Sequence, residues 1–335
     1  MSPRRRELLE IAGVTATAAA VGTTGWLTVA TQEEVNGELP AYSRWLTLEE
    51  TLTFTYVDWE SIGEDVEEEL EDAADEADAE VPTEYEDDPM IAPVSEELIS
   101  VYFFVGLDLA QYRLGRLLED DAFESTVEEL LRTDEALIAS GAIVPEEIDD
   151  ELTAEPPLEF IRQMERTAEI DTYDVYTPVD ADVDAAFAVD SDAVVFVDGE
   201  DVADDPVAVL ETTIGTAEGD GDRATDDSEA FAWLLETAGR GDVAVGQYGG
   251  PFDADELVHP AFEDVGDAEG IVASLTAEDE ETSAGDFAAI VDDPDEDELE
   301  GVLGVAGPVL ERSVDVDGDR VVATATWQEE DWTDS

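Results

Sequence analysis

Acidic side chains dominate this chain and limit what it can fold into. Asp and Glu number 92 against 13 basic residues, all of them arginine, and the formal net charge is −79. A disordered acidic tail would lack alternating apolar strands, yet such strands recur along the chain. Molar salt shortens the Debye length to about 3 Å and screens the self-repulsion of such a surface. The composition therefore predicts a folded, salt-adapted protein, and it argues against nucleic acid as a partner because phosphates need basic side chains.

The N-terminus carries the pattern of a targeting segment. Arg5 and Arg6 stand one residue before Leu8 and Leu9, and residues 11–30 follow without a charged side chain. Twin-arginine signals direct export, which predicts export machinery as a partner and the cell surface or the extracellular space as the location. The run closes with small residues that suit cleavage. Its length also reaches the roughly 20 residues of a membrane span, so a cleaved signal and an uncleaved membrane anchor both stay open.

Two stretches, 136–199 and 285–328, share the order strand, helix, strand, strand. In the first, Pro145 opens a helix at the first helical position, where its missing N–H is not needed. In the second, Asp293 has Glu296 three residues on, which is capping-box spacing and makes Asp293 the expected N-cap. An Asp-Gly-Asp run at 317–319 is typical of a hairpin turn. The shared order predicts an internal duplication.

The predicted fold class is therefore α+β. We expect two similar antiparallel sheet units, each ββαββ-like with helices covering one face, after an N-terminal signal or anchor helix. If the helices after Pro145 and Asp293 are equivalent, Leu299 should match either Leu152 or Ile148 as a buried residue. The expected segments are a signal or anchor (1–30), a short lead-in (31–50), a first repeat (51–217) with an acidic linker at about 63–93 and an inserted helix, a connecting helix (218–240), a second repeat (241–328) and an acidic tail (329–335).

Helix signals appear in three further places. A buried helix is expected from Ser95 to about Leu118, because its middle is apolar on all sides. Asp205 and Pro206 begin the inserted helix, which Gly215 is expected to end. The connecting helix has an apolar stripe at helical spacing, formed by Phe231, Leu234, Leu235 and Ala238.

Several of these runs carry a family resemblance. They are Arg5-Arg6, the stretches 42–46, 54–59, 173–178 and 231–235, the run 241–245 and the closing hairpin 314–327. Together they resemble an uncharacterised family of exported haloarchaeal proteins with a twin-arginine signal. The resemblance spans nearly the whole chain, but its motifs are structural. It implies export and a duplicated fold, and it implies no catalytic residues.

Missing residue types exclude several chemistries. Without lysine the chain has no phosphate-loop lysine and no Schiff base, and without cysteine it has no thiol nucleophile, thiolate site or disulfide. One histidine rules out two-histidine zinc motifs. His259 could serve a serine triad, but no nucleophile-elbow motif is present, and a surface or loop histidine is the simpler interpretation. The glycine-rich run at 246–250 lacks dinucleotide spacing and indicates a turn after a strand.

Two acidic runs are candidates for cation binding. Asp180, Asp182 and Asp184 begin like a calcium loop, but Ala185 stands where the glycine belongs and the later glutamate is missing. The second run is an oxygen cluster that helix capping also explains, formed by Asp292, Asp293, Asp295 and Asp297. We expect loosely bound cations, no organic cofactor, and calcium as an open alternative.

These observations favour a non-enzymatic envelope or surface binding module whose ligand the sequence does not define. The alternative is an extracellular carboxylate-dependent hydrolase. With 92 acids, carboxylate pairs at any chosen spacing arise by chance, so their spacing alone does not support the hydrolase. A cleft lined by two facing carboxylates and aromatic side chains would favour the hydrolase, and flat faces would favour the binding module.

Overall fold

The computed structural model describes residues 39–48, 50–63, 66, 88–119, 122–156, 158, 160–180, 182–199, 202, 205–250, 252, 257–277 and 282–328. The predicted signal or anchor with Arg5, Arg6, Leu8 and Leu9, most of the acidic linker and the acidic tail lie outside these residues. The chain divides into two compact units. The first unit is Ala41–Gly63 with Glu97–Glu229, and the second is Glu64–Glu96 with Ala230–Ser335 and Met1–Pro40.

The first unit contains strands β1 (Leu52–Asp58), β2 (Thr126–Thr133), β3 (Leu137–Ala142), β4 (Met164–Ile170), β5 (Tyr173–Pro178), β6 (Ala185–Val189) and β7 (Ala193–Asp198). Its helices are η1 (Ala41–Trp45), η2 (Leu109–Tyr112), α4 (Pro145–Thr153), α5 (Pro206–Glu218) and α6 (Ala224–Asp227). Helix α3 (Ala92–Asp108) begins in the second unit and ends in the first. The structure thus ends the predicted Ser95–Leu118 helix early and continues it as the 3-10 helix η2.

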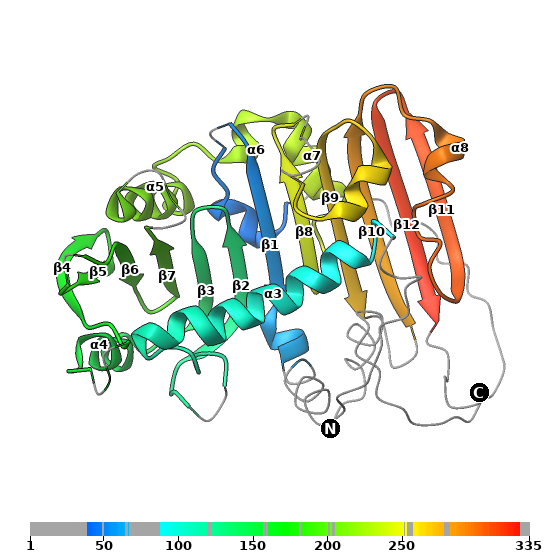
Figure 1. Cartoon of the computed structure of the whole chain (residues 1–335). Helices are drawn as coiled ribbons and strands as arrows, with labels where there is room; N and C mark the ends of the chain where they lie inside the picture. Colours follow the sequence, from blue (N-terminus) through cyan, green and yellow to red (C-terminus); the bar gives the residue numbers. More distant parts are fainter. Residues whose placement is uncertain are drawn as a thin grey trace, which may run out of the picture. The chain divides into compact units, whose positions relative to one another are not determined.

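Aromatic side chains fill the core of the first unit. Phe187 of β6 and Phe196 of β7 lie opposite each other with ring centroids 4.5 Å apart. Tyr112 of η2 packs on both, with its ring centroid 5.0 Å from that of Phe187. Helix α5 also packs on β6 and β7 (Figure 1). Every residue of β6 is buried, as expected for a strand that is covered on both faces.

The second unit contains strands β8 (Val243–Tyr248), β9 (Ala268–Ala277), β10 (Thr282–Val291), β11 (Val309–Asp317) and β12 (Arg320–Gln328), with helices α7 (Glu229–Ala238), η3 (Pro260–Val265) and α8 (Glu296–Leu299). Helix α7 packs on one sheet face through Phe231, whose ring centroid lies 5.2 Å from that of Tyr248. On β12 every second side chain is buried, and the last of these is Trp327. All of β8 is buried, so both faces of this strand are covered.

The twelve strands form one antiparallel sheet with few helices, in the order β11-β12-β10-β9-β8-β1-β2-β3-β7-β6-β5-β4. The predicted fold class of two similar ββαββ-like sheet units is therefore wrong. The units also differ in strand content, because seven strands precede α5 and five follow α7. Strand patterning fixes which face a side chain takes, but it does not fix which strand edges pair. The N-terminal helix of that prediction lies outside the described residues.

Turns and helix starts were predicted more accurately than the arrangement of the strands. Strands β11 and β12 form the hairpin expected around Gly318, which adopts a φ of 72°, and β2 and β3 form another hairpin. Pro145 occupies the first turn of α4 as predicted. Helix α5 continues past Gly215 and ends at Gly219, whose φ is 88°. Asp295, not Asp293, caps α8, because its side chain accepts from the N–H groups of residues 297 and 298.

Within the described segments, no helix combines the length and the apolar character that a membrane span requires.

Candidate ligand pocket

A small pocket lies in the second unit beside η3. It has a volume of about 150 Å³. Its wall includes Gln247 of β8, Phe252, Leu257, Glu263 of η3, Asp267 and Ala268 of β9. The pocket therefore combines one amide, two carboxylates and an apolar surface.

Gln247 is the most informative residue of this wall. Its side chain is fully buried, with 0% exposed. Its Oε1 accepts a hydrogen bond of 2.8 Å from the N–H of Val258, which fixes the amide orientation and makes Nε2 the donor end. Among the residues that the structure describes, Nε2 has no hydrogen-bond partner. A buried amide donor in this condition is rare in folded proteins and calls for an explanation.

Hydrogen bonds hold the backbone at Glu263 and Asp267, the residues that carry the two carboxylates. Glu263 lies within η3, and its carbonyl accepts from the N–H of Gly266 at 3.2 Å. The carbonyl of Asp267 accepts from the N–H of Asp292 at 3.0 Å. Gly266, between them, adopts a φ of 96°, which favours glycine. Both carboxylate side chains are exposed, so they can accept hydrogen bonds from an occupant at the pocket rim.

His259 is buried rather than at the surface, with 5% exposed, and it starts the same 3-10 helix. Its Nδ1 accepts from the N–H of Ala261 at 3.0 Å, and its Nε2 lies 3.1 Å from Oε2 of Glu96. Since Nδ1 is an acceptor, the proton of the neutral ring sits on Nε2 and is donated to Glu96. Both nitrogens are therefore engaged, which leaves neither for activating a serine. His259 positions η3 and hence Glu263.

The predicted cation candidates form turns and caps in the structure. The Asp180 carboxylate accepts from the N–H of Asp182 at 3.1 Å, and the Asp184 carbonyl accepts from the N–H of Gly199 at 2.9 Å. In the second run, Asp295 caps α8. Within the described ranges, no three Asp, Glu or His side chains converge as a metal site. Calcium binding stays an untested prediction.

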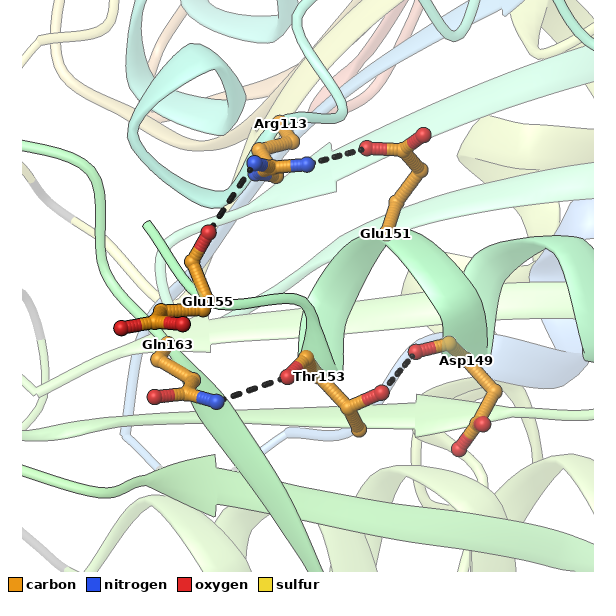
Figure 2. A network of polar contacts seen from close by, with 6 residues as sticks. All are labelled: Arg113, Asp149, Glu151, Thr153, Glu155 and Gln163. Atoms are coloured by element: carbon orange, nitrogen blue, oxygen red, sulfur yellow. Dashed lines mark hydrogen bonds and ion pairs between the residues drawn. The ribbon is translucent and has the colours of Figure 1, made fainter. Parts of the chain in front are cut away.

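A polar cluster around Arg113 was not predicted from the sequence (Figure 2). The guanidinium donates to Glu151 of α4 at 3.2 Å and to the carbonyl of Glu155 at 3.3 Å. Gln163 donates to the carbonyl of Thr153 at 2.7 Å. These bonds join η2 to the end of α4 and to the segment that follows it. Because the bonds link side chains to the end of α4 and to the segment after it, the cluster stabilises the packing of these segments in the first unit.

Asp88 is a second unpredicted polar feature, within the second unit. Its carboxylate is buried, with 1% exposed, and it accepts four backbone hydrogen bonds. Oδ1 accepts from the N–H groups of Met90 and Gly304, and Oδ2 accepts from those of Val305 and Ala306 at 2.7 and 3.0 Å. The carboxylate thus fixes the loop between α8 and β11, and its own lone pairs are occupied.

The pocket had one partial signal in the sequence. Gln247 is a polar residue inside the apolar strand run 243–248, and such a residue usually needs a buried partner. The other wall residues come from loops, and no spacing rule relates them to Gln247. Comparisons with protein-family models, curated proteins and solved structures found no match for this chain.

Proposed function

We propose that this chain is an exported, salt-adapted, non-enzymatic binding module of the cell envelope or surface, and that it takes a small polar ligand in the Gln247 pocket. The observation that carries the proposal is the pocket itself, which the exposed residues Glu263 and Asp267 line together with Phe252. The two side chains can accept hydrogen bonds and the aromatic ring offers an apolar surface, so a small polar ligand can use both.

Export and salt adaptation rest on the sequence. The twin-arginine pattern at Arg5 and Arg6 supports export, and the net charge of −79 supports a medium in which salt screens repulsion. We expect the double substitution Arg5→Lys and Arg6→Lys to retain the protein in the cytoplasm, as measured by fractionation and immunoblotting. The matched control is Arg44→Lys, which lies outside the signal. Export of the double variant at the wild-type level would contradict the targeting proposal.

Ligand binding is tested on the native protein. The full chain is purified in molar salt, and small molecules released on denaturation are identified by mass spectrometry, in parallel with the variant Gln247→Met. We expect a small polar compound to accompany the wild-type protein at near-stoichiometric amounts and to be lost from the variant. Gln247→Met also removes the acceptor for Val258, so Glu263→Gln, at the rim, serves as a second variant. Identical extracts from all three proteins would contradict binding in this pocket.

A carboxylate-dependent hydrolase is the second candidate, favoured by one observation. Glu263 and Asp267 line the same pocket as the aromatic ring of Phe252. Glycoside hydrolysis commonly uses a pair of carboxylates. The exposure of both carboxylates favours binding over catalysis, since a catalytic acid needs a raised pKa and burial is the usual means of raising it. Hydrolysis of aryl glycosides that is lost in both Glu263→Gln and Asp267→Asn would favour the hydrolase.

A further inference from the structure

We propose that the first unit rests on an anionic phospholipid bilayer through an apolar patch, formed by the exposed side chains of Phe103, Leu107, Leu158, Phe160 and Val179. This inference rests on the proposed envelope location and not on the ligand pocket, which lies in the second unit. Exposure, position and local charge each support it.

Exposed apolar side chains are concentrated in this patch. Among the described residues, eight large apolar side chains are exposed, and five of the eight belong to the patch. Their exposed fractions run from 48% at Phe103 to 68% at Leu107. Single exposed apolar residues are ordinary on a protein surface, but a contiguous group of them is often a site of interaction.

The patch begins at the end of α3. Phe103 and Leu107 are four residues apart and therefore share one face of this helix. Between them Gly106 leaves the face open, because a Cβ added there would meet no atom of a neighbouring segment within 4 Å. Helix η2 begins two residues after Leu107, so segments that bond to η2 lie close to this face.

Two loop segments extend the patch beside η2. The N–H of Arg162 donates to the carbonyl of Gln111 in η2 at 2.6 Å, which brings the loop with Leu158 and Phe160 alongside that helix. The N–H of Val179 donates to the carbonyl of the residue after Arg162 at 2.9 Å. The three segments that supply the patch are therefore neighbours in the fold.

Acidic side chains are scarce beside the patch, although they dominate the chain as a whole. Residues 98–118 contain one acid, Asp108, and two arginines, Arg113 and Arg116, whereas the chain has 92 acids in 335 residues. Arg116 pairs with Glu119, but its side chain stays largely exposed. Because guanidinium groups bind phosphate through paired N–H donors, this stretch can meet a phospholipid headgroup with little repulsion.

A bilayer fits the patch better than a second protein molecule. The five side chains expose roughly 500 Å², whereas a standard protein interface buries about 800 Å² on each partner. A second copy would also bring another net charge of −79. Binding to a bilayer grows with the apolar area inserted and needs no matching shape. Molar salt screens the long-range repulsion between an anionic bilayer and the acidic chain.

The predicted anchor would favour the same contact. Ten residues, 31–40, separate the uncharged run 11–30 from Ala41, where the first unit begins. Such a length of chain spans at most about 35 Å. An uncleaved anchor would therefore hold the first unit near the membrane and raise its effective concentration there.

The test places a fluorescent reporter in the patch. The chain has no cysteine, so Gly106→Cys gives one attachment site for an environment-sensitive dye, and Glu211→Cys, at an exposed position of α5, is the matched control. The full chain is labelled and mixed in molar KCl with phosphatidylglycerol vesicles whose acyl chains carry a nitroxide quencher. We expect the dye at Gly106→Cys to emit at shorter wavelength and to be quenched, and the dye at Glu211→Cys to do neither.

Replacing apolar side chains separates the patch from the anchor. In the Gly106→Cys background, Leu107→Ser with Phe160→Ser should lower the fraction of quenched dye about tenfold or more, even where an anchor still holds the protein on the vesicles. Leu310→Ser removes a similarly exposed leucine from β11 and should leave quenching unchanged. The thermal unfolding midpoints of these variants should agree, because the replaced side chains are exposed.

Three results would overturn the proposal. The first is a dye at Gly106→Cys that vesicles neither shift nor quench. The second is quenching that persists in the Leu107→Ser, Phe160→Ser variant, since the patch would then not be what contacts lipid. The third is a shift without vesicles that grows with protein concentration, which would assign the patch to a second copy. The pocket proposal is tested separately, by the compounds that the native protein releases.

Discussion

At the scale of single residues, Asp88 shows how a strongly acidic chain can use a carboxylate as a structural group. Four backbone N–H groups surround it, three of them from residues 304–306. Gly304 among them has a φ of 62°, and a Cβ added there would lie 2.9 Å from Cβ of Ala325. Both features require glycine at that position. The carboxylate and the glycine together hold this loop against β12.

Replacing Asp88 by asparagine tests that role. The carboxylate accepts on both oxygens, whereas an amide has one NH₂ end that would face two N–H groups whichever way it turned. We expect Asp88→Asn to lower the free energy of unfolding by about 3 kcal/mol, measured by chemical denaturation at fixed molar salt. Asp315→Asn, which removes one exposed carboxylate from β11, is the matched control. Equal stability of the two variants would contradict the structural role.

Asp190 provides a test by pH. Burial would raise the pKa of Asp190, but hydrogen bonds from the Thr172 hydroxyl and from Ser191 outweigh it and lower the pKa below its ordinary value. A lowered pKa in the folded state stabilises the fold above the pKa of the unfolded chain, and this contribution is lost as the pH falls through the folded-state pKa. Thr172→Val should therefore cost up to about 1 kcal/mol at neutral pH, and less as the pH falls below about 4.

Thermal unfolding across this pH range measures the difference. Thr324→Val is the control, because its hydroxyl contacts that of Ser313 at 2.8 Å and neither group titrates in this range. The effect of the control should not vary with pH. A constant deficit for Thr172→Val from neutral to acidic pH would show that its hydrogen bond does not favour the ionised form of Asp190.

At the scale of elements, local chemistry determined what could be predicted. Hairpins and helix starts depend on a few neighbouring residues, so Gly318, Pro145 and the stripe at Phe231 were correctly interpreted. Strand β4 was missed because five consecutive residues of its seven are exposed, and an edge strand of this kind has no apolar alternation to detect. The α8 cap was misplaced by two residues, because several aspartates in that run could each accept the capping bonds.

Helix α5 provides the test at this scale. The Asp205 carboxylate accepts from the N–H of Val207 at 3.0 Å and caps the helix. We expect Asp205→Ala to lower the free energy of unfolding by about 1 kcal/mol, the usual cost of a lost N-cap. Glu211→Ala changes the same charge at an exposed position within α5 and should be neutral or slightly stabilising, since alanine favours helix. A loss in Glu211→Ala as large as that in Asp205→Ala would contradict the capping role.

At the scale of the whole molecule, the sequence defined the elements but not their assembly. Periodicity identified most strands, yet the single sheet depends on which edges pair, and that information lies in contacts far apart in the chain. The pocket could not be predicted from the sequence for the same reason. Gln247 belongs to β8 and Glu263 to η3, and both line the same pocket. No local sequence pattern relates these two positions.

Salt dependence is the prediction that belongs to the whole molecule. Lowering the salt to roughly 0.1 M lengthens the Debye length to about 10 Å, so the carboxylates that give a net charge of −79 repel over a longer range. We expect the midpoint of thermal unfolding to rise with KCl, by on the order of 10 °C between these conditions. Sucrose, which favours burial without screening charge, is the control and should stabilise less. A midpoint that does not change with KCl would contradict salt adaptation.

The bonds from Asp88 to the loop at Gly304 also determine how early the second unit can finish folding during synthesis. These two residues are 216 positions apart. At a ribosomal rate of about 5–20 residues per second, Asp88 is made roughly 10 to 40 seconds before the N–H groups that it will accept from. Throughout that interval its carboxylate is without the three N–H partners from residues 304–306. The second unit therefore cannot be completed before residues 304–306 have been made.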